Sequence, residues 1–307
     1  MHRARRQAAR TTLCGLFACC VAAGAAASGP ATPLVPPVAT FEEQVAALVN
    51  QERADCTLAA CPLSPLKLVS VLGALADEHS GSMAGEDYFS HCDFTTGLDP
   101  FERLIAAGYP YSSAAENIAG GSTTPAAVVA QWMASAVHRA NILADGFREQ
   151  GVGYHFQSGD LANVDYDRNS DCDCADSGES CSYQALGHYW TQMFGARNTA
   201  YPLVIEGERH ATSAGTVSLY VYGPATALEM RFSNDGVAWS PWQSFSHDAL
   251  WSLAAGDGLR TVFSEVRNAT TVYRACDRIW RTGGGGAELF VDSFDCDATG
   301  AWSPAQP

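Results

Sequence analysis

The chain carries little positive charge. Lys67 is its single lysine, and 18 basic residues stand against 33 acidic ones, which gives a formal net charge of −15. Residues 1–27 contain four arginines and no acids, so the net charge becomes −19 without them. Proteins bind nucleic acids and anionic membranes largely through Lys and Arg. The acidity therefore argues against both as partners.

Two catalytic signatures are absent from the sequence. It contains neither Gly-x-Ser-x-Gly, which presents a serine nucleophile, nor His-Glu-x-x-His, which holds a peptidase zinc on a helix. Its first apolar run, Thr11–Ala27, is shorter than the roughly 20 residues that span a bilayer. Hydrolases of these two kinds and an N-terminal membrane span therefore have no support.

The N-terminus has the composition of a secretory signal. Basic residues from Arg3 to Arg10 precede the apolar run, which ends at Ala25-Ala26-Ala27, an A-x-A cleavage site. Residues 1–27 are therefore predicted to be a signal peptide, and the mature chain to be extracellular or periplasmic. A lipoprotein anchored at Cys19 is the alternative, because Leu16-Phe17-Ala18-Cys19 is similar to a lipobox, although Phe17 is bulky for its position.

Eleven cysteines become eight once Cys14, Cys19 and Cys20 leave with the signal. An even number in an exported chain predicts disulfides. Proximity favours Cys56–Cys61, and a Cys276–Cys296 pair would join the C-terminal tail to the preceding domain. For Cys172 and Cys174, a Cys-x-Cys zinc site is the alternative to disulfide bonding.

Helix signals dominate the first half of the chain. After a Pro-rich leader at 28–39, Thr40 and Glu43 form a capping box that predicts a helix start. Three further starts pair a capping residue with a proline at the first helical position. They are Ser64-Pro65, Asp99-Pro100 and Thr124-Pro125, and Gly108 is predicted to end the helix that begins at Asp99.

Strand signals follow the helices. Gly151–Phe156 and Tyr189–Phe194 are rich in β-branched and aromatic residues, with glycine close by. Helices followed by antiparallel strands predict an α+β domain. His79 lies one helical turn from Met83 and is predicted to be packed rather than to be a ligand.

The sequence pattern of the C-terminal part of the chain predicts an all-β structure. Val217–Tyr222 alternates with period two, and turns occur at Asn234-Asp235-Gly236 and Ala254–Gly258. Residues 201–282 are therefore predicted to form a β-sandwich, followed by a Gly-rich linker and tail at 283–307. Four aromatic residues are predicted to fill its core: Trp239, Trp242, Phe245 and Trp251.

Four segments in one order and spacing carry a family resemblance. They are Tyr88–His91, Glu116–Ala119, Trp132–Leu143 and Tyr189–Gly195. Together they resemble the bacterial branch of the CAP superfamily (cysteine-rich secretory, antigen 5, pathogenesis-related; also called SCP). The resemblance implies an α-β-α sandwich over residues 40–200. In the second domain, Met230–Gly236 and Gly256–Val262 are similar to immunoglobulin-like modules of bacterial exported proteins.

The CAP resemblance also implies a cleft lined by histidine and glutamate. His91 and Glu116 match its first histidine and first glutamate, while Ser135 stands where the eukaryotic pattern has a second glutamate. His138, three residues after Ser135, is expected on the same helical face. His188 precedes Tyr189, with an alignment that is uncertain by one residue because of Trp190.

Some family members bind a divalent metal through the cleft histidines. Two imidazoles and a carboxylate suit zinc, so His91, His138 and Glu116 form a candidate zinc site with one open position. The alternative is purely structural: His138 and Arg139 hydrogen-bond a helix end, and Glu116 holds a loop.

An acidic loop is the second candidate metal site. Oxygen-bearing side chains alternate through it, as calcium loops require. Ser170 and Asp176 depart from the EF-hand pattern at its sixth and twelfth positions, and a disulfide-stapled surface loop is the alternative. The candidate calcium ligands are Asp165, Asp167, Asn169, Asp171, Asp173 and Asp176.

Two functions of different class follow. The first is an exported, non-catalytic CAP-domain protein that binds an extracellular lipid, glycan or protein. The second is a metal-dependent hydrolase of peptide or cell-wall material acting through His91, Glu116 and His138. Because no catalytic signature is present, the binding protein is favoured. An unmetallated cleft with a long apolar groove would support the first function, and a bound metal with an exchangeable water the second.

Overall fold

The computed structural model describes residues 35–57 and 60–283. All of them lie in one compact unit, Thr32–Pro307, whereas the other unit, Met1–Ala31, lies outside the described residues together with the predicted signal and lipobox. Helices and a sheet alternate through the first half, and only strands follow, so the predicted α+β order is confirmed. The helices are α1 (Phe41–Asp55), α2 (Ser70–Gly85), α3 (Pro100–Ala106), α4 (Pro125–Ala134) and α5 (Ala136–Ile142).

Capping explains where three of these helices begin. Thr40 Oγ1 accepts from the Glu43 amide at 3.2 Å, and the Glu43 carboxylate accepts from the Thr40 amide at 2.8 Å, so the predicted capping box is confirmed. Asp99 and Thr124 cap α3 and α4 as predicted. The start predicted at Ser64 is wrong, because α2 begins only at Ser70, after a short strand, and has no side-chain cap.

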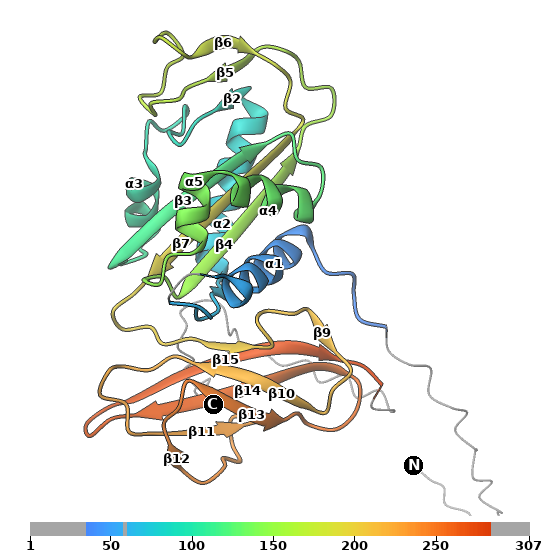
Figure 1. The fold of residues 1–307 in the computed structure, drawn as a ribbon, viewed down its shortest axis with the longest axis vertical. Helices are drawn as coiled ribbons and strands as arrows, with labels where there is room; N and C mark the ends of the chain where they lie inside the picture. The colour runs from blue at the N-terminus through green and yellow to red at the C-terminus, as the bar shows by residue number, and fades with distance from the viewer. Residues whose placement is uncertain (1–34, 58–59, 284–307) are drawn as a thin grey trace, which may run out of the picture. The chain divides into compact units, whose positions relative to one another are not determined.

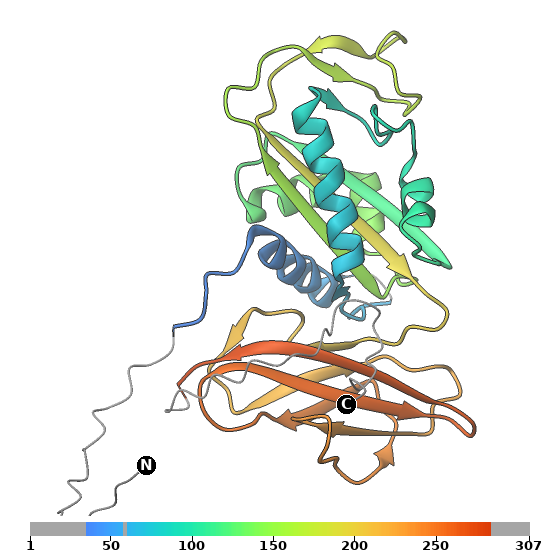
Figure 2. The same cartoon turned by 180° about the vertical axis from the view of Figure 1, so that it is seen from behind.

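A four-stranded sheet lies between two layers of helices. Helices α1, α4 and α5 cover one face of it in Figure 1, and α2 covers the other in Figure 2. The strand order is β1-β4-β7-β3, in which β4–β7 and β7–β3 are antiparallel. The strands are β1 (Lys67–Leu68), β4 (Glu149–Phe156), β7 (His188–Ala196) and β3 (Ser113–Gly120).

Two glycines of β4 allow α2 to lie directly on the sheet. A Cβ atom at Gly151 would stand 2.1 Å from the Leu72 carbonyl carbon, and one at Gly153 would stand 2.2 Å from that of Ala76. Val152, between them, points to the opposite face and packs in the core with Trp132 and Trp190. The alternation of glycine and valine along β4 thus determines how closely α2 approaches the sheet.

A small sheet extends this domain. Its order is β2-β5-β6, with β2 parallel to β5 and β5 antiparallel to β6. The acidic loop predicted as a calcium site connects the last two strands. The strands are β2 (Tyr88–Phe89), β5 (Val164–Tyr166) and β6 (Ser180–Tyr183).

Disulfides fix the loops around this small sheet. Cys92 is bonded to Cys172 and Cys174 to Cys181, so the Cys-x-Cys zinc hypothesis is wrong, because neither sulfur is a free thiolate. The predicted Cys56–Cys61 bond is present. Cys276 is also disulfide-bonded, and its predicted partner, Cys296, lies outside the described residues.

Two further sheets enclose a second core. One has the order β13-β10-β8 and the other β12-β11-β14-β15-β9, and apolar side chains of both meet in one cluster that includes Leu219 and Phe232. The strands are β8 (Leu203–Ile205), β9 (Ala211–Thr212), β10 (Thr216–Val221), β11 (Glu229–Ser233), β12 (Gln243–Ser244), β13 (Asp248–Ser252), β14 (Gly258–Arg267) and β15 (Val272–Arg281).

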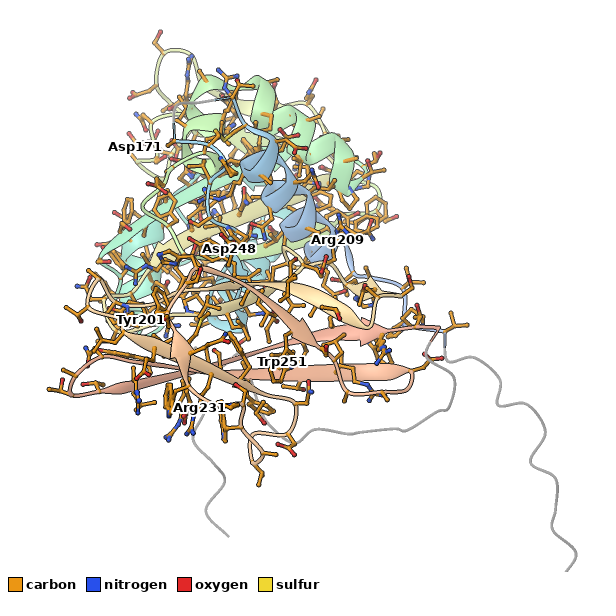
Figure 3. The ribbon with its side chains drawn as sticks, turned by 60° about the horizontal axis from the view of Figure 1, so that its bottom comes forward. Asp171, Tyr201, Arg209, Arg231, Asp248 and Trp251 are labelled. Carbon is orange, nitrogen blue, oxygen red and sulfur yellow. A yellow bond between two sulfur atoms is a disulfide. The ribbon has the colours of Figure 1, made fainter. Side chains whose placement is uncertain are left out.

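Two of the four aromatic residues predicted for this core take part in it. Phe245 and Trp251 pack against it, and Trp251 is labelled in Figure 3. The ring centroids of Trp251 and Phe232 lie 5.5 Å apart. Trp239 packs against a separate small cluster of Phe263 and Cys276, and the Arg231 guanidinium lies 4.9 Å from its ring centroid. The prediction is wrong for Trp242, which belongs to no core cluster of the described residues and lies 4.4 Å from the same guanidinium.

Candidate functional site

His91 follows β2 on a segment that is fixed from both sides. The Ser90 hydroxyl donates to Asp167 at 2.8 Å, and Cys92 forms the disulfide to Cys172. Both partners belong to the acidic loop region that follows β5. The imidazole itself stays accessible, with 35 % of the side chain exposed. An accessible imidazole is thus presented on a restrained backbone.

Glu116, on β3, binds this imidazole. Its Oε1 atom lies 2.7 Å from His91 Nδ1, and its Oε2 atom lies 2.7 Å from a terminal nitrogen of Arg103, on α3. The same Arg103 nitrogen donates to the backbone carbonyl of His91 at 3.2 Å. Only 2 % of the Glu116 side chain is exposed. Both carboxylate oxygens are therefore used within the protein.

The electrostatics keep Glu116 ionised. Burial raises the pKa of its carboxyl, but the charge of Arg103, followed by contributions from His79 and His91, outweighs burial and holds the pKa below its ordinary value. An ionised carboxylate only accepts hydrogen bonds, so His91 Nδ1 carries a proton. In the neutral ring, the lone pair then resides on Nε2. The pair therefore orients His91 with Nε2 as its available acceptor.

His138, on α5, lies near these residues. Its backbone carbonyl accepts from the Asn117 amide at 3.2 Å, and Asn141, on the same helix, donates to the Glu116 carbonyl at 3.3 Å. Burial, and then the charge of His91, lowers the pKa of His138. Its Nδ1 atom is buried and has no hydrogen-bond partner among the described residues. Helix α5 thus brings a second, neutral imidazole toward the His91 site.

The sequence predicted that Ser135 and His138 lie on one face of a continuous helix, but Ser135 belongs to neither α4 nor α5. It is the residue at which α4 ends and α5 begins, with φ −86° and ψ 127°. Its extended backbone breaks the helix, and its side chain makes no capping hydrogen bond to α5. The i, i+3 argument fails because it assumed one continuous helix.

His188 does not join His91 and Glu116. It is the first residue of β7, where its Nδ1 atom lies 2.9 Å from the Tyr154 hydroxyl. In the β3–β7 register Glu116 is opposite Met193, five residues further along β7. Since side chains alternate between faces, His188 and Met193 point to opposite faces of the sheet. The placement of His188 in the cleft is thereby corrected.

Arg103 is the site residue that the sequence did not predict. It follows the Asp99 cap by four residues and is 9 % exposed, and nothing in its local sequence distinguishes it from a surface arginine. His79 is packed, as predicted, with Nε2 2.9 Å from the Ser90 carbonyl. Its hydrogen bond lowers the pKa of Asp93. His79 thus helps to fix the backbone of the segment that carries His91, through its contact with the Ser90 carbonyl.

The candidate zinc ligands do not converge. Among the described residues, no group that contains His91, Glu116 and His138 places ligand atoms within 4.8 Å of one another. Glu116 already contacts Arg103 and His91 with its two oxygens. These residues do not fit a three-ligand zinc ion, because binding would first require Glu116 to leave Arg103.

The acidic loop brings together only part of its predicted calcium set. Asp167 and Asp171 lie with Glu179, which had not been predicted, with oxygens within 4.8 Å. All three carboxylates accept hydrogen bonds from nearby amides. Asn169 instead contacts Asp171 and Asp176, whereas Asp165 lies beside the Cys174–Cys181 disulfide and Asp173 accepts from the amide of Ala175. A calcium site here remains a prediction.

Comparison with known proteins agrees with the CAP resemblance. Residues 46–194 match the cysteine-rich secretory protein (CAP) family. The chain is 39 % identical over 117 residues to the uncharacterized protein YkwD of Bacillus subtilis strain 168, a match that spans 38 % of this chain and 43 % of that protein. The chain thus spans less than half the length of this curated relative. Residues 46–194 are therefore similar to this family.

Two solved structures are also similar. An extracellular SCP-domain protein from Bacillus anthracis str. Ames shares 24 % identity with a TM-score of 0.37, covering 51 % of this chain and 40 % of that one. An outer surface protein from Borrelia burgdorferi shares 14 % identity with a TM-score of 0.38, covering 53 % of this chain and 100 % of that one.

Proposed function

We propose that this chain is an exported bacterial CAP-domain protein that binds an extracellular glycan at His91 and does not transform it. The observation that carries the proposal is the engagement of both Glu116 oxygens by His91 and Arg103. A carboxylate held in this way positions an imidazole, but it is not free to act as a base toward substrate. Nε2 of His91 is then the group that meets the ligand.

The polar surroundings favour a glycan over a lipid. The accessible His91 imidazole and the His138 imidazole, whose Nδ1 atom has no partner among the described residues, form the set of groups with hydrogen-bonding capacity left for a ligand, whereas Arg103 and Asn141 already donate within the protein. Sugar hydroxyls both donate and accept, so they can satisfy such a set, whereas an acyl chain would leave it unpaired.

The hydrolase alternative has less support. It needs a metal held by His91, His138 and Glu116, or Glu116 as a base beside that metal. Either role would take the carboxylate from the Arg103 guanidinium and leave a buried positive charge without its partner.

Export rests on the sequence of residues 1–27, and the lipid anchor at Cys19 is the competing proposal. Within the described part of the chain, no helix is both long enough and apolar enough to cross a membrane. We further propose that residues 201–282 are an immunoglobulin-like module attached to a CAP domain at 40–200, with residues 28–39 and 283–307 as leader and tail.

Calorimetric titration of the mature protein with soluble peptidoglycan fragments tests the binding function. We expect saturable binding that weakens at least tenfold in His91→Ala, because Nε2 is removed. His155→Ala is the matched control, since His155 is an exposed histidine on β4. Equal affinity of the wild type and His91→Ala, or no binding by the wild type, would reject the proposal.

A further inference from the structure

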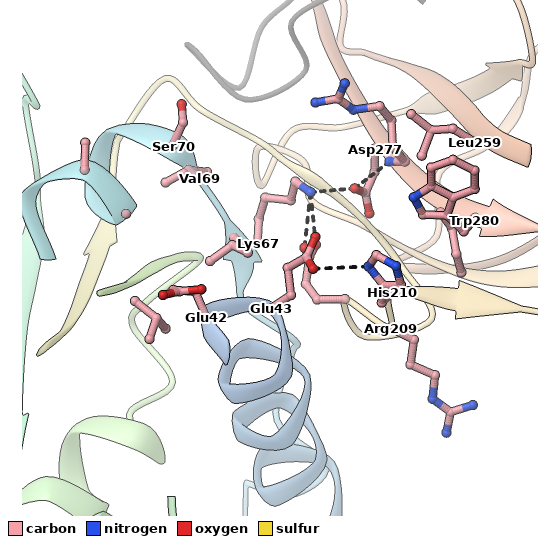
Figure 4. A pocket seen from close by; sticks show the side chains of 17 residues that line it. Glu42, Glu43, Lys67, Val69, Ser70, Arg209, His210, Leu259, Asp277 and Trp280 are labelled. Carbon is pink, nitrogen blue, oxygen red and sulfur yellow. Dashed lines mark hydrogen bonds and ion pairs between the residues drawn. The ribbon is translucent and has the colours of Figure 1, made fainter. Parts of the chain in front are cut away.

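A pocket of about 510 Å³ lies where the first domain meets the second (Figure 4). The start of α1 and the β1–α2 connection form one side, through residues such as Glu42 and Lys67. The segment Glu208–His210 and strand β15 form the other, through residues such as Trp280. Ligand sites commonly have volumes of roughly 300–1,000 Å³ and occur preferentially at domain interfaces. The pocket has the size and the place of a binding site.

Buried ion pairs hold the two sides together. Lys67 Nζ, on β1, lies 3.1 Å from Glu208 and also contacts Asp277, on β15. The three side chains are only 5–9 % exposed. Figure 4 shows a dashed line that joins Lys67 to Asp277. Because these buried charges are paired with one another across the pocket, its two walls are held in a fixed arrangement before any ligand binds.

A histidine forms a second connection across the pocket. His210 Nδ1 lies 3.2 Å from the Glu43 carboxylate, and its Nε2 lies 2.8 Å from the Pro37 carbonyl. These contacts join the segment before β9 to the start of α1. The Glu43 carboxylate also completes the α1 capping box, so its position is fixed from two directions.

Two lining groups remain available for a ligand. Within the described residues, the Glu42 carboxylate has no hydrogen bond or ion pair, and no acceptor meets the indole N–H of Trp280, which is half-buried. In Figure 4 they lie on opposite sides of the lysine. The pocket therefore offers one strong acceptor, one donor and an aromatic face.

The charge of the lining indicates the ligand class. Four carboxylates face three cationic side chains and one histidine, so the charges nearly cancel and favour neither an anion nor a cation. A sugar ring has hydroxyls that donate to a carboxylate and accept from an indole N–H, and an apolar face that packs on an aromatic ring. We propose that this pocket binds a neutral sugar residue between Glu42 and Trp280.

This site is separate from His91, and the proposal does not rest on the function proposed for His91. The test is therefore made in the mature full chain carrying His91→Ala. The probes are the methyl glycosides of glucose, galactose, mannose and N-acetylglucosamine, followed by saturation-transfer NMR and calorimetry. A second arm measures co-sedimentation with insoluble peptidoglycan, which separates free sugars from wall glycan as the source of the ligand.

Two variants and two controls locate the site. Trp280→Ala and Glu42→Gln are each expected to weaken binding at least tenfold. Trp242→Ala and Glu52→Gln, a tryptophan and a glutamate outside the lining, should bind like the parent, and thermal unfolding checks that all four fold. Should Trp280→Ala fail to fold, Glu42→Gln decides alone. The proposal is overturned if no probe binds in either arm, or if Glu42→Gln binds within twofold of the parent.

Discussion

Gly153→Ala is expected to destabilise the first domain severely. The new methyl group would stand 2.2 Å from the Ala76 carbonyl carbon and 2.2 Å from the Asp77 amide nitrogen, both in the backbone of α2. No side-chain rotation relieves such a clash, so the helix must move away from the sheet. Overpacking of this kind costs about 3 kcal/mol or more, which lowers the melting temperature by roughly 10 °C in a domain of this size.

Gly73→Ala is the matched control for this prediction. Gly73 lies on α2 and has no atom within 4 Å of the position a Cβ would take, so alanine should stabilise the helix by up to about 1 kcal/mol. Thermal unfolding followed by circular dichroism measures both variants with the disulfides intact. If Gly153→Ala melted together with the wild type, the direct packing of α2 on β4 would be incorrect.

Glu116→Ala is expected to have the second large effect. The variant leaves the Arg103 guanidinium buried without its carboxylate, which costs about 3–5 kcal/mol. It also removes the acceptor that orients His91. Chemical unfolding at neutral pH measures the loss of stability. Glu102→Gln serves as the control, because Glu102 lies on the same helix as Arg103 but is exposed.

The effect of Glu116 depends on pH with a defined sign. Its pKa is lower in the folded state than its ordinary value, so its contribution is present above the unfolded pKa and is lost as the pH falls through the folded pKa. The difference between wild type and Glu116→Ala should therefore shrink in acid. The double variant Glu116→Leu/Arg103→Met should recover most of the stability, because no charge is left unpaired. A double variant as unstable as the single one would contradict the ion-pair account.

Capping residues in the sequence predicted the starts of those helices that have a side-chain cap. Asp99 and Thr124 are followed by proline and cap α3 and α4, whereas α2 begins at Ser70 without any side-chain cap. Ser64-Pro65 has the composition of a helix start, yet the chain continues into β1, where Lys67 pairs with Glu149 of β4. Strand pairing between residues so far apart in the sequence cannot be recognised from the residues around Ser64 alone.

The candidate site was predictable in part. The family resemblance indicated His91 and Glu116, and the structure places them in contact. It did not indicate Arg103, whose role arises only when α3 packs beside β3. Ser135 and His188 were misplaced for two reasons: a helix break without glycine or proline has no sequence signal, and a one-residue uncertainty on a strand reverses the face.

The most direct test of the account follows the His91 ring by NMR while soluble peptidoglycan fragments are added to the mature protein. The account predicts a ring that carries a proton on Nδ1, a saturable shift of the His91 resonances, and fragments that remain chemically unchanged. Fragments that were cleaved by the wild type but not by Glu116→Gln would contradict it and establish a hydrolase.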